Sequence, residues 1–116
     1  MSTNKNTDTD LYRNNAVTNT KILIRAGTCS IKGWIVNNPN AAESFLQIHD
    51  AATTGDVTLG TTVPVLPIKV GANGSVVITE HDYQIPFSLG MVIAATTTEG
   101  GSSAPVTPVS VLILYK

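Results

Sequence analysis

The sequence predicts an all-β domain, an antiparallel two-sheet β-sandwich that follows an extended N-terminal arm. Short runs rich in Val, Ile and Thr recur at a spacing of about ten residues, as the strands of a sandwich do. Gly, Pro, Asn or Asp bounds each run, and no twelve-residue stretch carries the apolar stripe of a helix. The length of 116 residues fits a single domain.

Residues 1–19 form the predicted arm, because they are mostly Asn, Thr, Asp and Ser. So few apolar side chains cannot offset the conformational entropy of an ordered backbone. Leu11 and Tyr12 are two adjacent apolar residues within the arm. We expect them to anchor it on a neighbouring molecule, while residues 20–116 fold without it. A plain disordered terminus is the alternative.

Seven runs have the length and the β-branched content of strands: residues 20–26, 29–37, 44–50, 63–70, 75–79, 89–98 and 109–115. An eighth, short strand is expected at residues 57–59, within a stretch that otherwise reads as a loop. Gly27-Thr28 marks a tight joint between the first two runs. Asn73-Gly74 predicts a hairpin, because both residue types accept positive φ.

Prolines 64, 67 and 86 lie within or beside the predicted strands. Proline has no backbone N–H to donate to a neighbouring strand, so it is confined to sheet edges, strand ends and bulges. The segments that contain these prolines are therefore predicted to be edge strands or extended connections.

Alternation along the strands identifies apolar side chains on faces that also carry polar residues. In residues 29–37, strict alternation puts Trp34 on the polar side, and in residues 109–115 it puts Leu112 and Leu114 opposite the main apolar row. A strand that is apolar on both faces is either central and covered or lies at a subunit contact. For Trp34, a core position beneath the opposite sheet is the alternative. The interface candidates are Leu11, Tyr12, Trp34, Leu112 and Leu114.

The composition favours a protein that assembles with partners over a free monomer. Charged residues make up 13% of the chain, against about 25% in soluble domains. A weakly charged, hydroxyl-rich surface suits a protein whose faces are covered by copies of itself or by a larger scaffold. The lone cysteine, Cys29, is expected to be buried and reduced.

Charge and hydropathy also exclude two classes of partner. With a net charge of −1 and seven scattered cations, the chain has no basic cluster to follow phosphates, so no nucleic acid is expected. The N-terminus lacks the apolar segment of a signal peptide, and no apolar run reaches about 18 residues. We therefore expect synthesis in the cytoplasm and no membrane contact.

Two titratable clusters stand out, His49-Asp50 and Glu80-His81-Asp82. A metal site needs three or four converging ligands, and a hydrolase needs a nucleophile that an adjacent base activates. Neither cluster meets these requirements by its spacing. The sequence therefore predicts no enzyme activity, no metal and no cofactor.

Residues 20–50 hold a strand, a glycine turn, a strand ending in Asn-Asn and a third strand closing in aspartate. The later half adds Ile-Pro-Phe at 85–87, Leu-Gly-Met at 89–91 and Val-Leu-Ile-Leu-Tyr at 111–115. Over residues 20–116 this pattern resembles the capsid decoration, or cement, proteins of tailed bacteriophages. The resemblance implies a jelly-roll β-sandwich. It also implies a structural protein of the virion, a homotrimer on the outer surface of the phage head that bridges major capsid proteins.

Two other classes remain open. A receptor- or carbohydrate-binding module of a phage fibre or tail would carry aromatic residues on its loops, and Tyr83 and Phe87 fit that pattern. A small enzyme of cupin-like architecture would need His49 and His81 to meet inside the domain.

Overall fold

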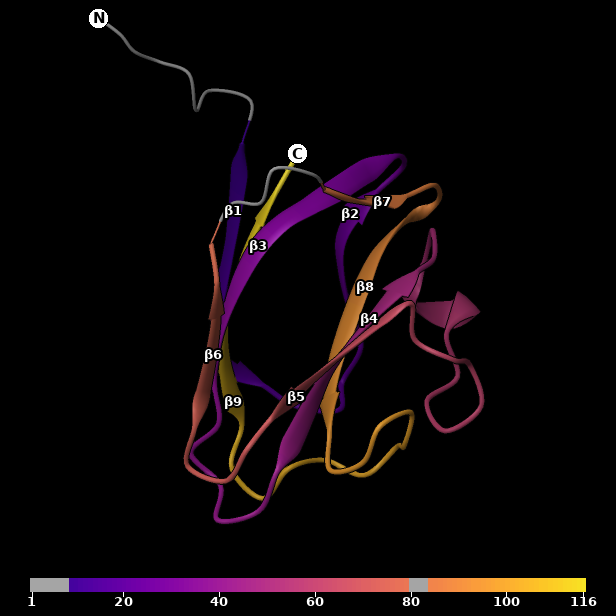
Figure 1. The fold of residues 1–116 in the computed structure, drawn as a ribbon. Helices are drawn as coiled ribbons and strands as arrows, with labels where there is room; N and C mark the ends of the chain where they lie inside the picture. Colours follow the sequence, from indigo (N-terminus) through magenta and orange to yellow (C-terminus); the bar gives the residue numbers. More distant parts are fainter. Residues whose placement is uncertain (1–8, 80–83) are drawn as a thin grey trace, which may run out of the picture.

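Two antiparallel sheets face each other in the computed structural model, which describes residues 9–79 and 84–116 (Figure 1). The strands are β1 (Asp10–Val17), β2 (Ile22–Ala26), β3 (Cys29–Asn37), β4 (Ser44–Asp50), β5 (Leu66–Val70), β6 (Ser75–Ile78), β7 (Ile85–Phe87), β8 (Gly90–Thr96) and β9 (Val109–Tyr115). Sheet A has the order β1-β9-β3-β6, with β7 also paired to β3, and sheet B has the order β2-β8-β4-β5.

This strand order is that of a jelly roll once β6 and β7 are taken as two halves of one edge strand. β6 pairs with β3 from Trp34 to Asn37, and β7 continues along β3 from Cys29 to Ile31. Two four-strand sheets result, and consecutive strands lie in opposite sheets except for the pairs β4 and β5, in sheet B, and β6 and β7, in sheet A. The predicted fold class, an all-β sandwich with jelly-roll-like topology, is confirmed.

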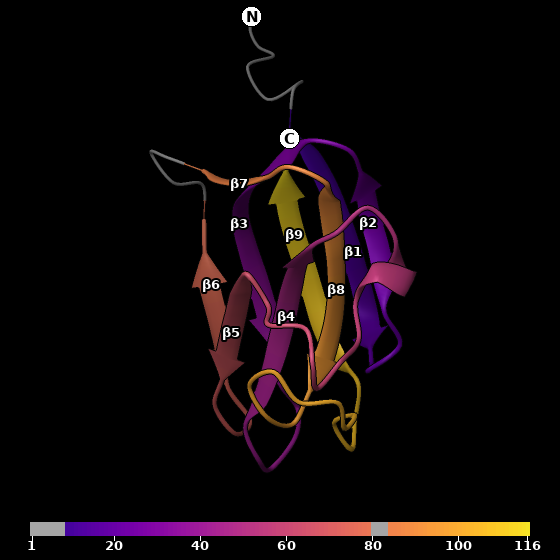
Figure 2. The same ribbon diagram turned by 90° about the vertical axis from the view of Figure 1, so that its right-hand side faces the viewer.

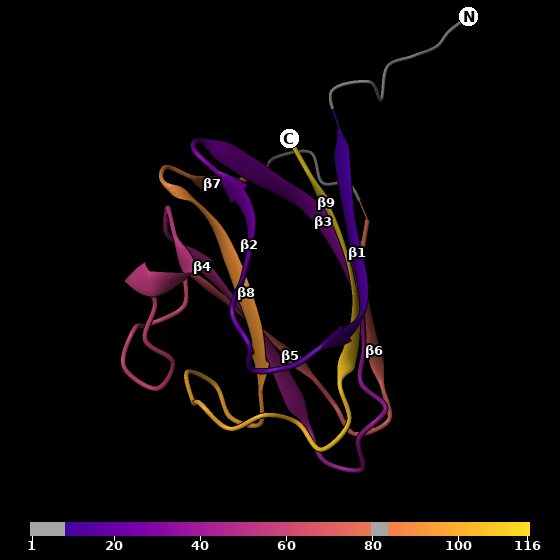
Figure 3. The same cartoon turned by 180° about the vertical axis from the view of Figure 1, so that it is seen from behind.

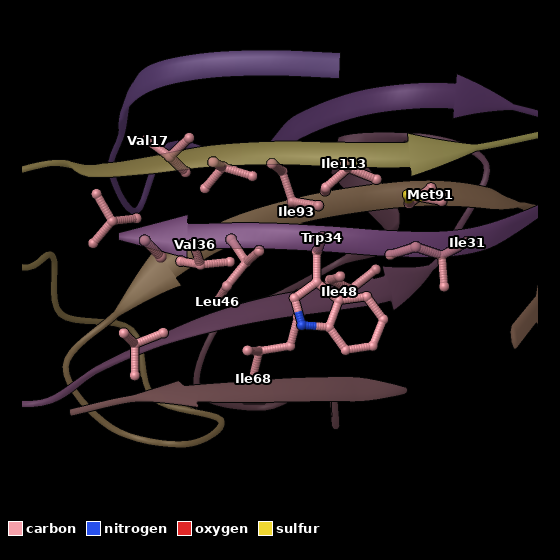
Figure 4. Close-up of a cluster of buried hydrophobic side chains, with 14 of the residues drawn as sticks. Val17, Ile31, Trp34, Val36, Leu46, Ile48, Ile68, Met91, Ile93 and Ile113 are labelled. Carbon is pink, nitrogen blue, oxygen red and sulfur yellow. The ribbon is translucent and has the colours of Figure 1, made fainter. Parts of the chain in front are cut away.

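The core lies between the sheets and is built from aliphatic residues of both (Figure 4). β3 and β9 supply Ile31, Val36 and Ile113 from sheet A, and β4 and β8 supply Ile48 and Ile93 from sheet B. All five are at most 1% exposed. Cys29 belongs to the same cluster, and burial raises the pKa of its thiol.

A bulge in β3 reverses the predicted alternation and places Trp34 in this core. Ile31 pairs with Tyr115 and Gly33 with Leu114, so Lys32 is an extra residue opposite β9. Beyond this point even-numbered residues of β3 point inward, and Trp34 is 8% exposed, among Ile48 and Ile68 (Figure 4). The prediction that Trp34 lies at an interface is therefore wrong, and its alternative as a core residue is correct.

The predicted boundary at residue 20 also differs from the structure, because β1 lies within the predicted arm. β1 pairs with β9 from Asp10↔Tyr115 to Val17↔Val109, and Figure 3 shows the two strands side by side. Two of its apolar residues face inward, since Tyr12 packs against the core and Val17 is fully buried, whereas Leu11 is exposed. Pairing with β9 satisfies the backbone groups of β1 that face β9, so a polar composition did not prevent a strand.

The Asn-Gly turn does not form the predicted hairpin. Gly74 N donates to Gly71 O at 3.0 Å, and Asn73 has a φ of 52°. However, β5 lies in sheet B and β6 in sheet A, so the turn carries the chain from one sheet to the other. The joint at Gly27, which has a φ of 95°, likewise crosses from β2 in sheet B to β3 in sheet A.

The remaining differences are local. The short strand expected at residues 57–59 is absent; a 3-10 helix, η1 (Thr54–Asp56), precedes Val57, which is buried against Ala51 and Val92. Pro67 lies in β5 and Pro86 in β7, and both strands are at sheet edges as predicted.

The bulge makes Gly33 intolerant of a side chain. A Cβ at Gly33 would lie 2.6 Å from the backbone oxygen of Ile78 in the neighbouring strand. We expect Gly33→Ala to lower the free energy of unfolding by about 1–3 kcal/mol, as overpacking does, in urea titrations. Gly71→Ala is the control, because nothing lies within 4 Å of its new Cβ. Equal losses in both variants would contradict the bulge.

Because β1 is part of sheet A, a chain that begins at Thr18 should be strongly destabilised. Removing β1 exposes one edge of β9 and the core beneath Val17, and a buried valine alone contributes about 1.5–3 kcal/mol. We expect a loss of at least about 3 kcal/mol in the free energy of unfolding. A chain that begins at Thr9 keeps β1 and serves as control. Identical unfolding midpoints for the two chains would show that β1 is dispensable.

Candidate interaction surface

The outer face of sheet A carries a contiguous group of exposed apolar side chains, which we call the sheet A patch. Its members are Leu11 in β1, Leu112 and Leu114 in β9, Ile35 in β3 and Val77 in β6. None of them belongs to the core cluster or packs against it. They point outward because the residues that alternate with them, such as Ile113 and Val36, fill the core.

Strand register places these side chains next to one another. Leu11 is paired with Leu114 across β1 and β9. On the next row, Leu112 is paired with Ile35, and Ile35 is paired in turn with Val77. Directly paired residues on one face have Cβ atoms about 4.5–5.5 Å apart, so the patch runs without a break from one edge of the sheet to the other.

The members of the patch differ in how far they reach solvent. Leu11 is 59% exposed and Val77 is 57% exposed, and they lie on the two edge strands. Ile35, Leu112 and Leu114 are half-buried. Polar groups border the patch: Arg13 is exposed on the same face of β1, and the Ser110 hydroxyl donates to Asn15 Oδ1 at 3.2 Å. An apolar centre with a polar rim is the arrangement of a protein–protein interface.

Three of the five predicted interface residues, Leu11, Leu112 and Leu114, come together in the patch. Tyr12 does not, because it faces inward, and its hydroxyl accepts a hydrogen bond from Asn14 Nδ2 at 2.9 Å. Trp34 lies in the core, as described above.

Ile35 and Val77 were not predicted to belong to the surface. Strict alternation along β3 put Ile35 on the same side as Ile31, whereas the extra residue at Lys32 turns it outward. Glycine inside a strand is a known marker of bulges, so Gly33 was the available signal. Val77 has no comparable signal, because β6 is apolar on both faces.

The outer face of sheet B differs, because the chain itself covers it. The connection from β4 to β5 packs there through Val57, which contacts Ala51 and Val92. Figure 2 shows this connection running from the end of β4 across β8 toward β2. Within residues 9–79 and 84–116, no segment covers the outer face of sheet A in this way (Figure 1).

The predicted titratable pair does not converge. His49 faces the covered side of sheet B, where its Nε2 lies 2.9 Å from Gln47 Oε1. The carboxylate of Asp50 accepts backbone N–H bonds from Ser88, Leu89 and Gly90 at 2.8–3.3 Å. Partial burial acts to raise the pKa of Asp50, but these bonds outweigh it and hold the pKa below its ordinary value. Asp50 therefore fixes the position of the loop that precedes β8.

The other titratable cluster, Glu80-His81-Asp82, lies outside the described residues, as does Tyr83. Among the residues that are described, no three His, Cys, Asp or Glu side chains gather as a metal site would require. Phe87, the other aromatic residue considered for a loop, is fully buried in the core.

One end of the sandwich holds a cleft of about 360 Å³ between the β3–β4 and β8–β9 connections. Its lining residues are Pro39, Asn40, Ala41, Ala42, Glu43, Ser44, Thr97, Pro105, Val106 and Thr107. None of these lining residues is aromatic. The cleft therefore lacks the flat ring surface on which sugars stack.

Two buried asparagines hold the loops at this end. Asn38 Nδ2 donates to the backbone oxygens of Ala42, Val70 and Gly71 at 2.9–3.2 Å. Asn40 bonds in both directions to the backbone of Thr107, at 2.7 and 2.9 Å. Three connections of the chain are tied together, which fixes the loop ends relative to the sheets.

No family model, curated protein or solved structure matches this chain. In the part of the chain that the structure describes, no helix has the length and hydropathy needed to cross a membrane.

Proposed function

We propose that this chain is a structural protein of a virus particle, a capsid decoration or cement protein that binds the outer surface of a phage head as a homotrimer. In this proposal the protein carries out no reaction. It stabilises the shell by binding across neighbouring major capsid proteins, because a ligand that binds only the assembled form shifts the equilibrium toward it.

The observation that carries the proposal is the sheet A patch. It places five aliphatic side chains on a sheet face that no described segment covers. Contiguous exposed apolar surface marks interaction sites on soluble proteins. The low charge of the chain, at 13% of residues, also fits a surface that is covered in the assembly.

The size of the patch indicates why several copies are needed. Four strands spaced at about 4.8 Å span roughly 15 Å, and a seven-residue strand is about 23 Å long. The whole outer face of sheet A thus measures roughly 350 Å², less than half of the ~800 Å² that each partner contributes to a standard interface, and the patch is smaller still. A contact of this size alone is weak, whereas three linked contacts gain through avidity. We assign the patch to contacts between copies and the fixed loop ends to the capsid.

The carbohydrate-binding alternative has less support. The cleft at the loop end has no aromatic lining residue, and Phe87 lies in the core. The cupin-like alternative requires His49 within the domain interior, whereas His49 faces away from the core on the outer side of sheet B.

Two substitutions at the exposed ends of the patch test the proposal. Leu11→Lys and Val77→Lys place charges at side chains that are 59% and 57% exposed, so folding should be unaffected. We expect the double variant to sediment as a monomer at micromolar concentrations at which the unaltered protein is a trimer. We also expect it to bind phage heads at least tenfold more weakly.

Leu89→Lys is the matched control, because Leu89 is 57% exposed and lies just before β8 in sheet B, away from both the patch and the loop end that holds the cleft. It should leave the trimer intact. A trimer that survives both patch substitutions would exclude the patch as the contact. A stable monomer of the unaltered protein that also fails to bind heads would contradict the proposed function.

A further inference from the structure

A buried histidine lies beneath the segment that covers sheet B. Phe45, Gln47 and His49 alternate with the core residues of β4, so they point to the outer side of the sheet. They are nevertheless buried, and His49 is 1% exposed. The chain on this side consists of the β4–β5 connection, residues 51–65, and the β8–β9 connection. We call residues 51–65 the sheet B cover.

The hydrogen bonds of this layer fix the protonation of His49. Gln47 Nε2 donates to Thr96 Oγ1 at 2.8 Å and to Gly101 O at 3.0 Å. The amide oxygen of Gln47 therefore faces His49 Nε2, at 2.9 Å, and acts as the acceptor. His49 must carry its hydrogen on Nε2, so Nδ1 is unprotonated. Among the described residues, no group forms a hydrogen bond with the buried Nδ1.

A positive charge already lies next to this histidine. The ammonium of Lys21, just before β2, donates to the backbone oxygen of Val57 and so ties the cover to the sheet. Burial first, and the charge of Lys21 second, hold the pKa of His49 below its ordinary value of 6.5. The imidazole of His49 is therefore neutral while the sheet B cover lies on the sheet.

Charged groups on the neighbouring elements do not compensate for a protonated ring. β8 contains no titratable residue. Lys69 on β5 is paired with Glu43 at 3.4 Å. The exposed carboxylates of Asp56, in η1, and Glu99, in the β8–β9 connection, are not among the causes that shift the pKa of His49.

We propose that His49 is an acid-sensitive latch, and that its protonation at Nδ1 releases the sheet B cover from the outer face of sheet B. A protonated ring would hold a buried N–H without an acceptor beside the ammonium of Lys21, which is costly in a desolvated site. Lifting the cover brings water to His49. It also exposes Val92 and breaks the bond between Lys21 and Val57.

The direction of the pH effect follows from linkage. Because the closed form binds this proton less readily than the open form, the cover is fully held above pH 6.5. It is progressively released as the pH falls from there toward the lowered pKa of the closed form. An opening linked to one proton grows by up to tenfold for each pH unit in that range.

Hydrogen exchange measured by mass spectrometry between pH 7.5 and 5.0, corrected for intrinsic rates, tests the latch in the full chain. The first and last amides of the cover donate to sheet B, Ala51 N to Gly90 O at 3.1 Å and Val65 N to Ile48 O at 3.0 Å. We expect their protection to fall at least tenfold as the pH drops, while β3 and β9 keep theirs. In His49→Gln, which cannot titrate, the acid effect should shrink to less than twofold.

His81→Gln is the matched control, since it removes the only other histidine of the chain. Should His49→Gln fail to fold, Lys21→Met takes its place, and a smaller acid-induced loss of protection in the cover is expected. An acid effect that persists in His49→Gln would overturn the latch. So would a loss of protection shared equally by the cover and the core strands, or one unchanged in Lys21→Met.

Discussion

The bulge at Lys32 and Gly33 determines what each face of sheet A presents. One extra residue in β3 shifts the side-chain alternation by one position. Before the bulge, Cys29 and Ile31 face inward; after it, Trp34 and Val36 do. Without this shift the indole would lie on the surface and Ile35 in the core. The core and the sheet A patch both depend on it.

The bulge also coincides with the interruption of the edge strand. β6 ends at Ile78, opposite Trp34, and β7 begins at Ile85, opposite Ile31. Gly33 lies between these pairs, where the backbone of Ile78 and Thr79 leaves no room for a Cβ. The edge beside β3 is therefore formed by two strands, with β7 on one side of the bulge and β6 on the other.

Periodicity and turn residues were sufficient to predict the fold class and most strands. β3, β4 and β9 begin and end where the alternation of apolar residues indicated. The predictions were wrong for segments whose structure depends on the strand they pair with rather than on their own sequence. β1 is too polar to be recognised alone and becomes a strand because β9 offers it an edge. The Asn-Gly turn was identified, but the sheet of each flanking strand depends on long-range pairing.

The sheet A patch was predicted only in part, because some of its residues face outward only as a result of long-range strand pairing. Leu112 and Leu114 were identified because β9 is apolar on both sides, and this property does not depend on neighbours. Ile35 was assigned to the wrong face, since a rule of strict alternation cannot include a bulge. The burial of His49 could not be predicted either, because it depends on a connection that packs back on sheet B.

The outer faces of the two sheets differ in their exposure to solvent. Sheet B is covered by its own chain, through Val57, which packs on Val92, and through the bond from Gln47 Nε2 to Gly101 O. Among residues 9–79 and 84–116, nothing covers the aliphatic face that sheet A presents across four strands. A domain that covers one face and leaves the other bare is suited to bind through the bare face, which is the basis of the proposed assembly role.

The environment of Trp34, the single tryptophan of the chain, shows whether the bulge in β3 exists, because the bulge is what turns this side chain inward. We predict that the fluorescence of the folded protein is shifted to shorter wavelength than in urea. We also predict that acrylamide quenches this fluorescence poorly, in the free protein as well as in any assembly. An indole that acrylamide quenches as readily in the folded monomer as in the unfolded chain would place Trp34 on the surface. That result would contradict the bulge and, with it, the composition of the sheet A patch.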